Sequence, residues 1–142
     1  MTTLRQLLKV KGHEIWSVTP DTSVFDTLVL MANKDVGALL VLDNGQTVGI
    51  ISERDYARNI ILKGRASKDT QVREVMTVDV VSAHPDQNVE ECMTLMTDRR
   101  IRHLPVLEDG GLLGVISIGD LVKSIIAEQK SLIDQLEHYI SG

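Results

Sequence analysis

The sequence contains an internal repeat, and this repeat limits the possible folds more than any other feature of the chain. When the chain is displaced by 65 positions against itself, Ser52 aligns with Ser117 and Asp55 aligns with Asp120. About a third of the positions from 15 to 62 are identical to their partners from 80 to 127, and many others exchange one apolar residue for another. Two copies of a small unit tend to pack about a pseudo-two-fold axis, which predicts two related clefts where the copies meet.

The composition is that of a globular protein with an aliphatic core. The chain has 142 residues, of which 43% are hydrophobic and only 3% aromatic, and no apolar run approaches the roughly 18 residues of a membrane span. A net charge of -5 argues against a nucleic-acid binder, which needs a basic face. The single Cys92 excludes an intrachain disulfide and favours a reducing, cytoplasmic location, although a mature mitochondrial protein has the same features.

The pattern of apolar runs and turn residues predicts a strand, a helix, two strands and a helix in each repeat. The strands are expected at 15–18, 38–42 and 48–51 in the first repeat and at 78–82, 104–107 and 112–116 in the second. This order gives an α/β (α+β) fold of two βαββα repeats. The expected domains are a first repeat with an amino-terminal helix (1–66), a second repeat (67–127) and a carboxyl-terminal helix extension (128–142).

Each repeat carries a Ser-x-x-Asp motif where the last strand is expected to give way to a helix. In a single copy this motif is first of all a helix cap. Its repetition at equal register favours a second interpretation, in which the carboxylates of Asp55 and Asp120 accept the hydroxyls of a ribose. In that interpretation the hydroxyls of Ser52 and Ser117 donate to a sugar or phosphate oxygen.

These motifs and their surroundings resemble tandem cystathionine-β-synthase (CBS) domains, also called Bateman modules. The resemblance rests on Gly-Ile-Ile-Ser-x-x-Asp at 49–55, on its copy Gly-Val-Ile-Ser-x-x-Asp at 114–120, and on Arg-His-Leu-Pro-Val at 102–106. It covers the chain from 15 to 126 and is greatest to small stand-alone CBS-pair proteins of bacteria and of plant mitochondria. It implies two βαββα units that form two equivalent clefts for adenine-containing ligands.

The resemblance also implies roles for further residues in these clefts. Two apolar pairs on the first strand of each repeat would flank adenine in the cleft of the other repeat, and four more apolar residues would line the remaining walls. The pairs are Ile15-Trp16 and Val80-Val81, and the wall residues are Ile50, Val115, Val36 and Ile101.

One pair of positions distinguishes the two repeats. Arg102 and His103 stand where family members reach phosphates, and a guanidinium fork with a pH-sensitive imidazole suits that role. The alternative is a surface arginine beside a histidine with a structural role. The aligned residues of the first repeat are Gly37 and Ala38, so phosphate binding is expected to be asymmetric.

The sequence therefore predicts a non-catalytic regulatory module that binds AMP, ADP, ATP or NAD(H), without a catalytic cofactor or a metal. No histidine stands near either motif serine at a spacing that would activate it. We expect a homodimer that modulates an enzyme in trans and contacts neither nucleic acid nor membrane. The alternatives are a ligand-independent interaction dimer, in which both motifs are only helix caps, and a weak nucleotide hydrolase.

Overall fold

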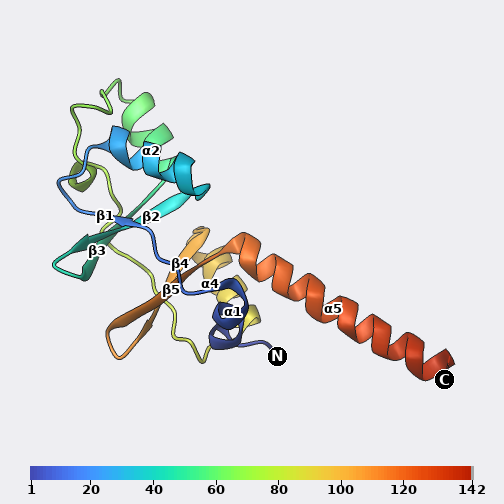
Figure 1. Ribbon diagram of the computed structural model, residues 1–142. Helices are drawn as coiled ribbons and strands as arrows, with labels where there is room; N and C mark the ends of the chain where they lie inside the picture. The colour runs from blue at the N-terminus through green and yellow to red at the C-terminus, as the bar shows by residue number, and fades with distance from the viewer. Residues whose placement is uncertain (142) are drawn as a thin grey trace. The chain divides into compact units, whose positions relative to one another are not determined.

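The chain of the computed structural model, described over residues 1–141, forms two units that do not coincide with its two halves. One unit is Ile15–Val80. The other combines Met1–Glu14 with the chain from Val81 onward. Figure 1 shows the elements of both units. The segment that precedes each repeat therefore belongs to the unit of the other repeat.

The first-repeat unit is built on a three-stranded sheet. Its strands are β1 (Ser17–Val18), β2 (Ala38–Asp43) and β3 (Gln46–Ser52), in the order β1-β2-β3, with β1 parallel and β3 antiparallel to β2. The helical segments are α2 (Val24–Lys34), α3 (Glu53–Tyr56), the π-helical η1 (Ala57–Ile61) and the 3-10 turn η2 (Val72–Glu74). Their apolar faces form one core: Val24, Met31, Leu39, Val41, Ile51, Ile60, Val72 and Val75.

The second-repeat unit has the same plan with one strand fewer in its described residues. It contains α1 (Leu4–Lys11), α4 (Val89–Arg99), the antiparallel hairpin β4 (His103–Glu108) and β5 (Gly111–Ser117), and α5 (Ile118–Ser141). The strand expected at 78–82 is not formed, and the chain makes only a single parallel bridge from Ala83 to Val106. A turn at Val80 precedes the bridge, and Pro85, which has no N–H to donate, follows it.

The amino-terminal helix packs with the second repeat, which corrects the expected 1–66 grouping. Leu4, Leu7 and Leu8 of α1 are buried in one core with Cys92, Met96 and other residues of that unit. The main-chain N–H of Leu4 donates to the carbonyl of Gln87 at 2.9 Å. The apolar face of α1 is thus buried, but against a part of the chain about 80 residues away in sequence.

The carboxyl-terminal helix is present as expected and is longer than its contacts require. Helix α5 has 24 residues, but only its first two turns pack, through Leu121 and Ile125. The side chains from Ile126 to the end of the described helix are exposed. Among residues 1–141, no helix is both long and apolar enough to cross a bilayer.

Candidate functional site

In the first-repeat unit, the Ser-x-x-Asp motif lies at the junction of β3 and α3. The main-chain N–H and the hydroxyl of Ser52 donate to Asp55 Oδ2 at 2.9 and 3.1 Å, and the N–H of Asp55 donates to Ser52 Oγ at 3.2 Å. The carbonyl of Gly37 accepts a hydrogen bond from the main-chain N–H of Glu53, and Ala38 is the cross-strand neighbour of Ser52. The motif is therefore a capping box at a strand end, lined by two small, uncharged residues.

In the second-repeat unit, the same geometry recurs at the junction of β5 and α5. The N–H of Ser117 donates to Asp120 Oδ2 at 2.8 Å, and the N–H of Asp120 donates to Ser117 Oγ at 3.1 Å. The carbonyl of Arg102 accepts from the N–H of Ile118, and His103 is the cross-strand neighbour of Ser117. The fold therefore brings the Arg102-His103 pair to the second motif.

A residue that the sequence did not single out completes this second site. The ammonium group of Lys11, in the last turn of α1, lies 2.5 Å from Asp120 Oδ2 and 2.5 Å from the carbonyl oxygen of Val115. The segments that lead the two repeats correspond at an offset of 68, because Leu4 and Val72 donate to the aligned carbonyls of Gln87 and Thr22. Met76, which packs against Gly49 in the other unit, is therefore the counterpart of Leu8 and not of Lys11. The 65-residue register therefore does not extend to Lys11, and the docking of α1 on the second repeat could not be predicted from it.

Charge and burial shape the ionisation of the second site. Burial raises the pKa of Asp120, but hydrogen bonds from Lys11 and Ser117 outweigh it and leave the pKa below its ordinary value. Burial, and then the nearby charge of Lys11, lower the pKa of His103. At neutral pH the site therefore holds a carboxylate and a neutral imidazole beside the cationic side chains of Lys11 and Arg102.

The apolar residues expected to line the clefts are divided between the two units, and all but one are half-buried. Ile15, Trp16, Val36, Ile50 and Val80 belong to the first-repeat unit, and Val81, Ile101 and Val115 belong to the second-repeat unit. Trp16 is the exposed exception, and the ammonium of Lys34 lies 4.2 Å from its ring centroid. This contact is a cation–π interaction that holds one face of the indole.

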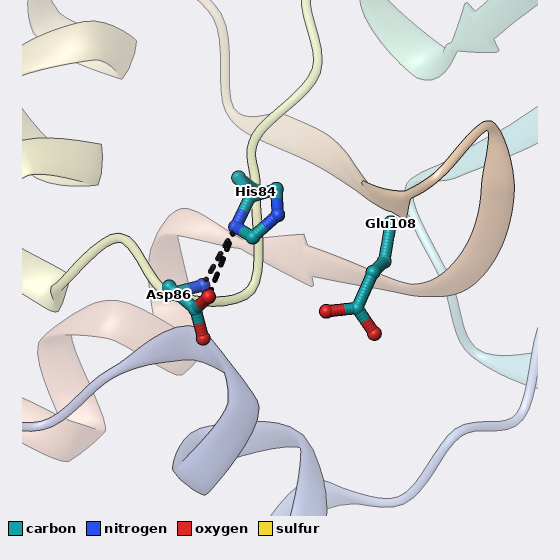
Figure 2. Close-up of side chains that lie close together, drawn as sticks. All are labelled: His84, Asp86 and Glu108. Atoms are coloured by element: carbon teal, nitrogen blue, oxygen red, sulfur yellow. Dashed lines mark hydrogen bonds and ion pairs between the residues drawn. The ribbon is translucent and has the colours of Figure 1, made fainter.

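A group of His84, Asp86 and Glu108 has metal-ligating atoms within 4.8 Å of one another, but both of its carboxylates are already paired with Arg5. Figure 2 shows the carboxylate of Glu108, on β4, opposite Asp86 and His84. The Arg5 guanidinium donates to Asp86 at 3.2 Å and also pairs with Glu108. His84 Nδ1 accepts from the N–H of Asp86 at 3.1 Å. We interpret this group as an ion-pair cluster that fixes α1 to its unit.

The buried thiol of Cys92 contributes packing to the second-repeat core. Its side chain has no exposed surface and lies among the leucines of α1 and the residues of α4. Burial, with a smaller contribution from the charge of Glu91, raises the pKa of Cys92 to about 11. A thiol with so high a pKa is a poor nucleophile at neutral pH, because the thiolate is the reactive form.

Comparisons with known proteins agree with the fold. The chain is 41% identical over 151 aligned residues to the CBS domain-containing protein CBSX3, mitochondrial, of Arabidopsis thaliana, an alignment that covers 99% of this chain and 73% of that protein. A solved structure of a protein with CBS domains from Burkholderia ambifaria MC40-6 is 53% identical, has a TM-score of 0.87 and matches 90% of this chain and 96% of its own.

A more distant structure was solved with ligands. The CBS domain pair of protein MJ0100, in complex with 5'-methylthioadenosine and S-adenosyl-L-methionine, has a TM-score of 0.79 at 21% identity and matches 90% of this chain and 98% of its own. At this identity the likeness is one of fold. The family model described as CBS domain matches residues 7–62 and 72–127, most of the chain. The chain belongs to the CBS domain family, as a protein with two such domains.

Proposed function

We propose that this protein is a regulatory module that binds an adenosine-containing anion, namely AMP, ADP, ATP or NAD(H), at the Ser-x-x-Asp motif of its second repeat. The observation that carries the proposal is the cluster of Asp120, Ser117, Lys11, Arg102 and His103 in one unit. A carboxylate suits ribose hydroxyls, and the cationic groups suit phosphate, so the two halves of a nucleotide find complementary partners.

The motif of the first repeat is proposed to bind more weakly, or to take an uncharged nucleoside. Ser52 and Asp55 offer the same hydrogen bonds there, but the positions aligned with Arg102 and His103 are Gly37 and Ala38. Neither of these two residues carries a charge. The proposed apolar walls for adenine are Val36, Ile50 and Ile15 at the motif of this unit, and Ile101, Val115 and Val81 at the motif of the second-repeat unit.

Lys11 gives the proposed site a means of responding to phosphate. In the structure it neutralises Asp120, the group that a ribose would need. When Asp120 binds the ribose hydroxyls, Lys11 loses its anionic partner, and the phosphate of a phosphorylated ligand can replace it. We propose that Lys11 changes partner in this way, which favours nucleotides over nucleosides.

The proposal extends to the role of the protein. The ligands of MJ0100 are adenosine derivatives, which supports the ligand class. We propose that the protein is not an enzyme and that it acts as a homodimer on a partner in trans, in the cytoplasm or as a mature mitochondrial protein. A ligand regulates such a partner only if the partner prefers one of the two ligation states.

The test compares Asp120→Asn with the matched Asp55→Asn by calorimetry with AMP and adenosine. Asparagine keeps a side-chain oxygen for the helix cap but removes the charge. We expect the Asp120 variant to lose AMP binding and the Asp55 variant to retain it, with Asp98→Asn on α4 as an exposed control. Mass spectrometry of nucleotides that copurify with the protein would identify the ligand directly.

The capping hydrogen bonds also favour a second candidate, a ligand-independent interaction protein in which both motifs only start helices. Under that candidate the melting temperature would not respond to millimolar AMP, ATP or NADH. A binder is stabilised by mass action, by about 2.7 kcal/mol when the ligand concentration is 100 times Kd. An unchanged melting temperature with all three ligands would therefore overturn the proposed function.

A further inference from the structure

The outer part of α5 exposes a continuous apolar seam. Leu132, Leu136 and Tyr139 have exposed fractions of 56%, 54% and 85%. Together with Val122, Ile125 and Gln129 they recur at alternating spacings of three and four residues, which places them along one side of the helix. A helical extension without tertiary contacts is only marginally stable in water, so this seam is expected to be covered.

The seam has the pattern of a coiled coil. In heptad terms, Val122, Gln129 and Leu136 occupy position a, and Ile125, Leu132 and Tyr139 occupy position d. The flanking e positions are Ile126, Ile133 and Ile140. The g positions of the exposed part are Glu128 and Gln135, whereas the inner g residue, Leu121, is buried in the core of its own unit. The pattern thus has an apolar flank on one side of the seam and a polar flank on the other.

The seam continues into a groove beside the first half of α5. This groove, of about 1230 Å³, is lined by α1, the start of α4 and α5. Its apolar residues include Ile125 and Leu132 of the seam and Val10 of α1, which is 90% exposed. A helix laid along the seam would therefore also contact α1.

We propose that the seam is covered by α5 of a second copy of this chain, running antiparallel to the first. The layers across the interface are Val122 with Tyr139, Ile125 with Leu136 and Gln129 with Leu132, each formed twice by the two-fold symmetry. Every a position then meets a d position. The two-fold axis passes between the levels of residues 130 and 131.

The flanking residues select the antiparallel direction. In that direction Glu128 lies beside Gln135 of the second copy, and Ile126 lies beside Ile133. In a parallel pair Glu128 would instead lie beside Ile133, which would desolvate a carboxylate against an apolar side chain. Only the antiparallel pair brings the outer half of one helix to the groove beside the inner half of the other.

The one polar seam residue also fits this arrangement. The two Gln129 side chains lie on either side of the axis at levels three residues apart, about 4.5 Å along the helix. Their amides can pair with each other at that separation. A polar residue in such a seam fixes the register at some loss of stability.

The first experiment changes the charge of the seam in the full chain and measures the mass of the assembly by sedimentation equilibrium. Leu136→Glu places a carboxylate in a layer of the seam, and we expect the variant assembly to contain half as many chains as the wild type. His138→Glu adds the same charge on the other side of the helix and should leave the mass unchanged. Equal masses for wild type and Leu136→Glu would overturn the proposal, and so would a monomeric wild type.

The second experiment tests the direction. Val122→Cys and Tyr139→Cys proteins are mixed and oxidised, and the disulfide-linked species are identified by mass. Antiparallel pairing gives the mixed species, because two Tyr139 positions lie about 25 Å apart along an antiparallel pair. Linkage of Tyr139→Cys to itself, or no linkage, would overturn the proposed geometry. Neither experiment uses a nucleotide, so the outcome is independent of the proposed function.

Discussion

Replacing Lys11 with methionine removes the positive charge that α1 brings to the second site. The change removes the ion pair with Asp120 and the hydrogen bond to the carbonyl of Val115, both at 2.5 Å. The side chain of Lys11 lies at the surface of its unit, and methionine has a similar length and helix propensity. The variant therefore tests the charge with little effect on α1.

The expected change in ligand affinity follows from the solvent exposure of the Lys11–Asp120 ion pair. The side chain of Lys11 is 36% exposed and that of Asp120 is 20% exposed, so solvent screens the pair and its contribution is about 1 kcal/mol. Adenosine binding, which must break this pair, should gain up to about fivefold in the variant. AMP loses a charge-assisted hydrogen bond, which is worth about 1.5–3 kcal/mol. The ratio of AMP affinity to adenosine affinity should therefore fall at least about tenfold.

The assay is isothermal titration calorimetry of wild type, Lys11→Met and Lys9→Met with AMP and with adenosine at pH 8. Lys9 is exposed on the same helix and has the same charge, so its variant controls for the long-range field of α1. If Lys11→Met changed the affinities for AMP and adenosine equally, the proposed exchange of Lys11 from Asp120 to the phosphate would be refuted. A wild type that binds neither ligand would instead refute the proposed site itself.

Three further predictions concern individual groups of the second-repeat unit. Arg102→Ala should weaken AMP binding by about tenfold or more and leave adenosine binding nearly unchanged, which competition calorimetry would measure; equal losses would exclude Arg102 as a phosphate ligand. The folded pKa of His103 is lowered, so the unfolded chain binds the proton first and stability should fall as the pH decreases below 6.5. Urea denaturation of His103→Gln should show a smaller loss over that range, and an unchanged pH dependence would contradict the assignment. The thiol of Cys92, with a pKa of about 11, should resist iodoacetamide at pH 8 until urea unfolds the unit. Rapid labelling of the native protein would instead show that the core of the second-repeat unit opens to solvent.

The sequence was sufficient for the features that depend on local chemistry and on the repeat register. Both hairpins turn at a pair with positive φ, Asn44-Gly45 and Asp109-Gly110, as the turn residues predict. Both Ser-x-x-Asp motifs lie at the junction of a strand and a helix, where the pattern of apolar runs placed them. These features are predictable because the residues that determine them are within a few positions of one another.

The remaining features depend on contacts between distant parts of the chain. The leucines of α1 show that the helix buries one face, but they do not show which repeat receives it. For the same reason the partner of Lys11 could not be predicted. The strand expected at 78–82 has suitable residues, but a strand also needs a neighbour in register. Only the flanking residues Thr77 and Ala83 form a bridge, with Ile50 and Val106.

The docking of each leading segment also gives a structural reason for the two motif glycines. A Cβ added at Gly114 would lie 2.8 Å from Leu8 Cδ2, and one added at Gly49 would lie 2.9 Å from Met76 Cγ. Each glycine therefore admits the segment that precedes the other repeat, whether or not a ligand binds. One segment is the eight-residue helix α1 and the other contains the three-residue 3-10 turn η2, so the segments can alter one site without disturbing the strands and helices that the repeats share. The charge of Lys11 is such an alteration, and it makes two motifs of equal geometry chemically different.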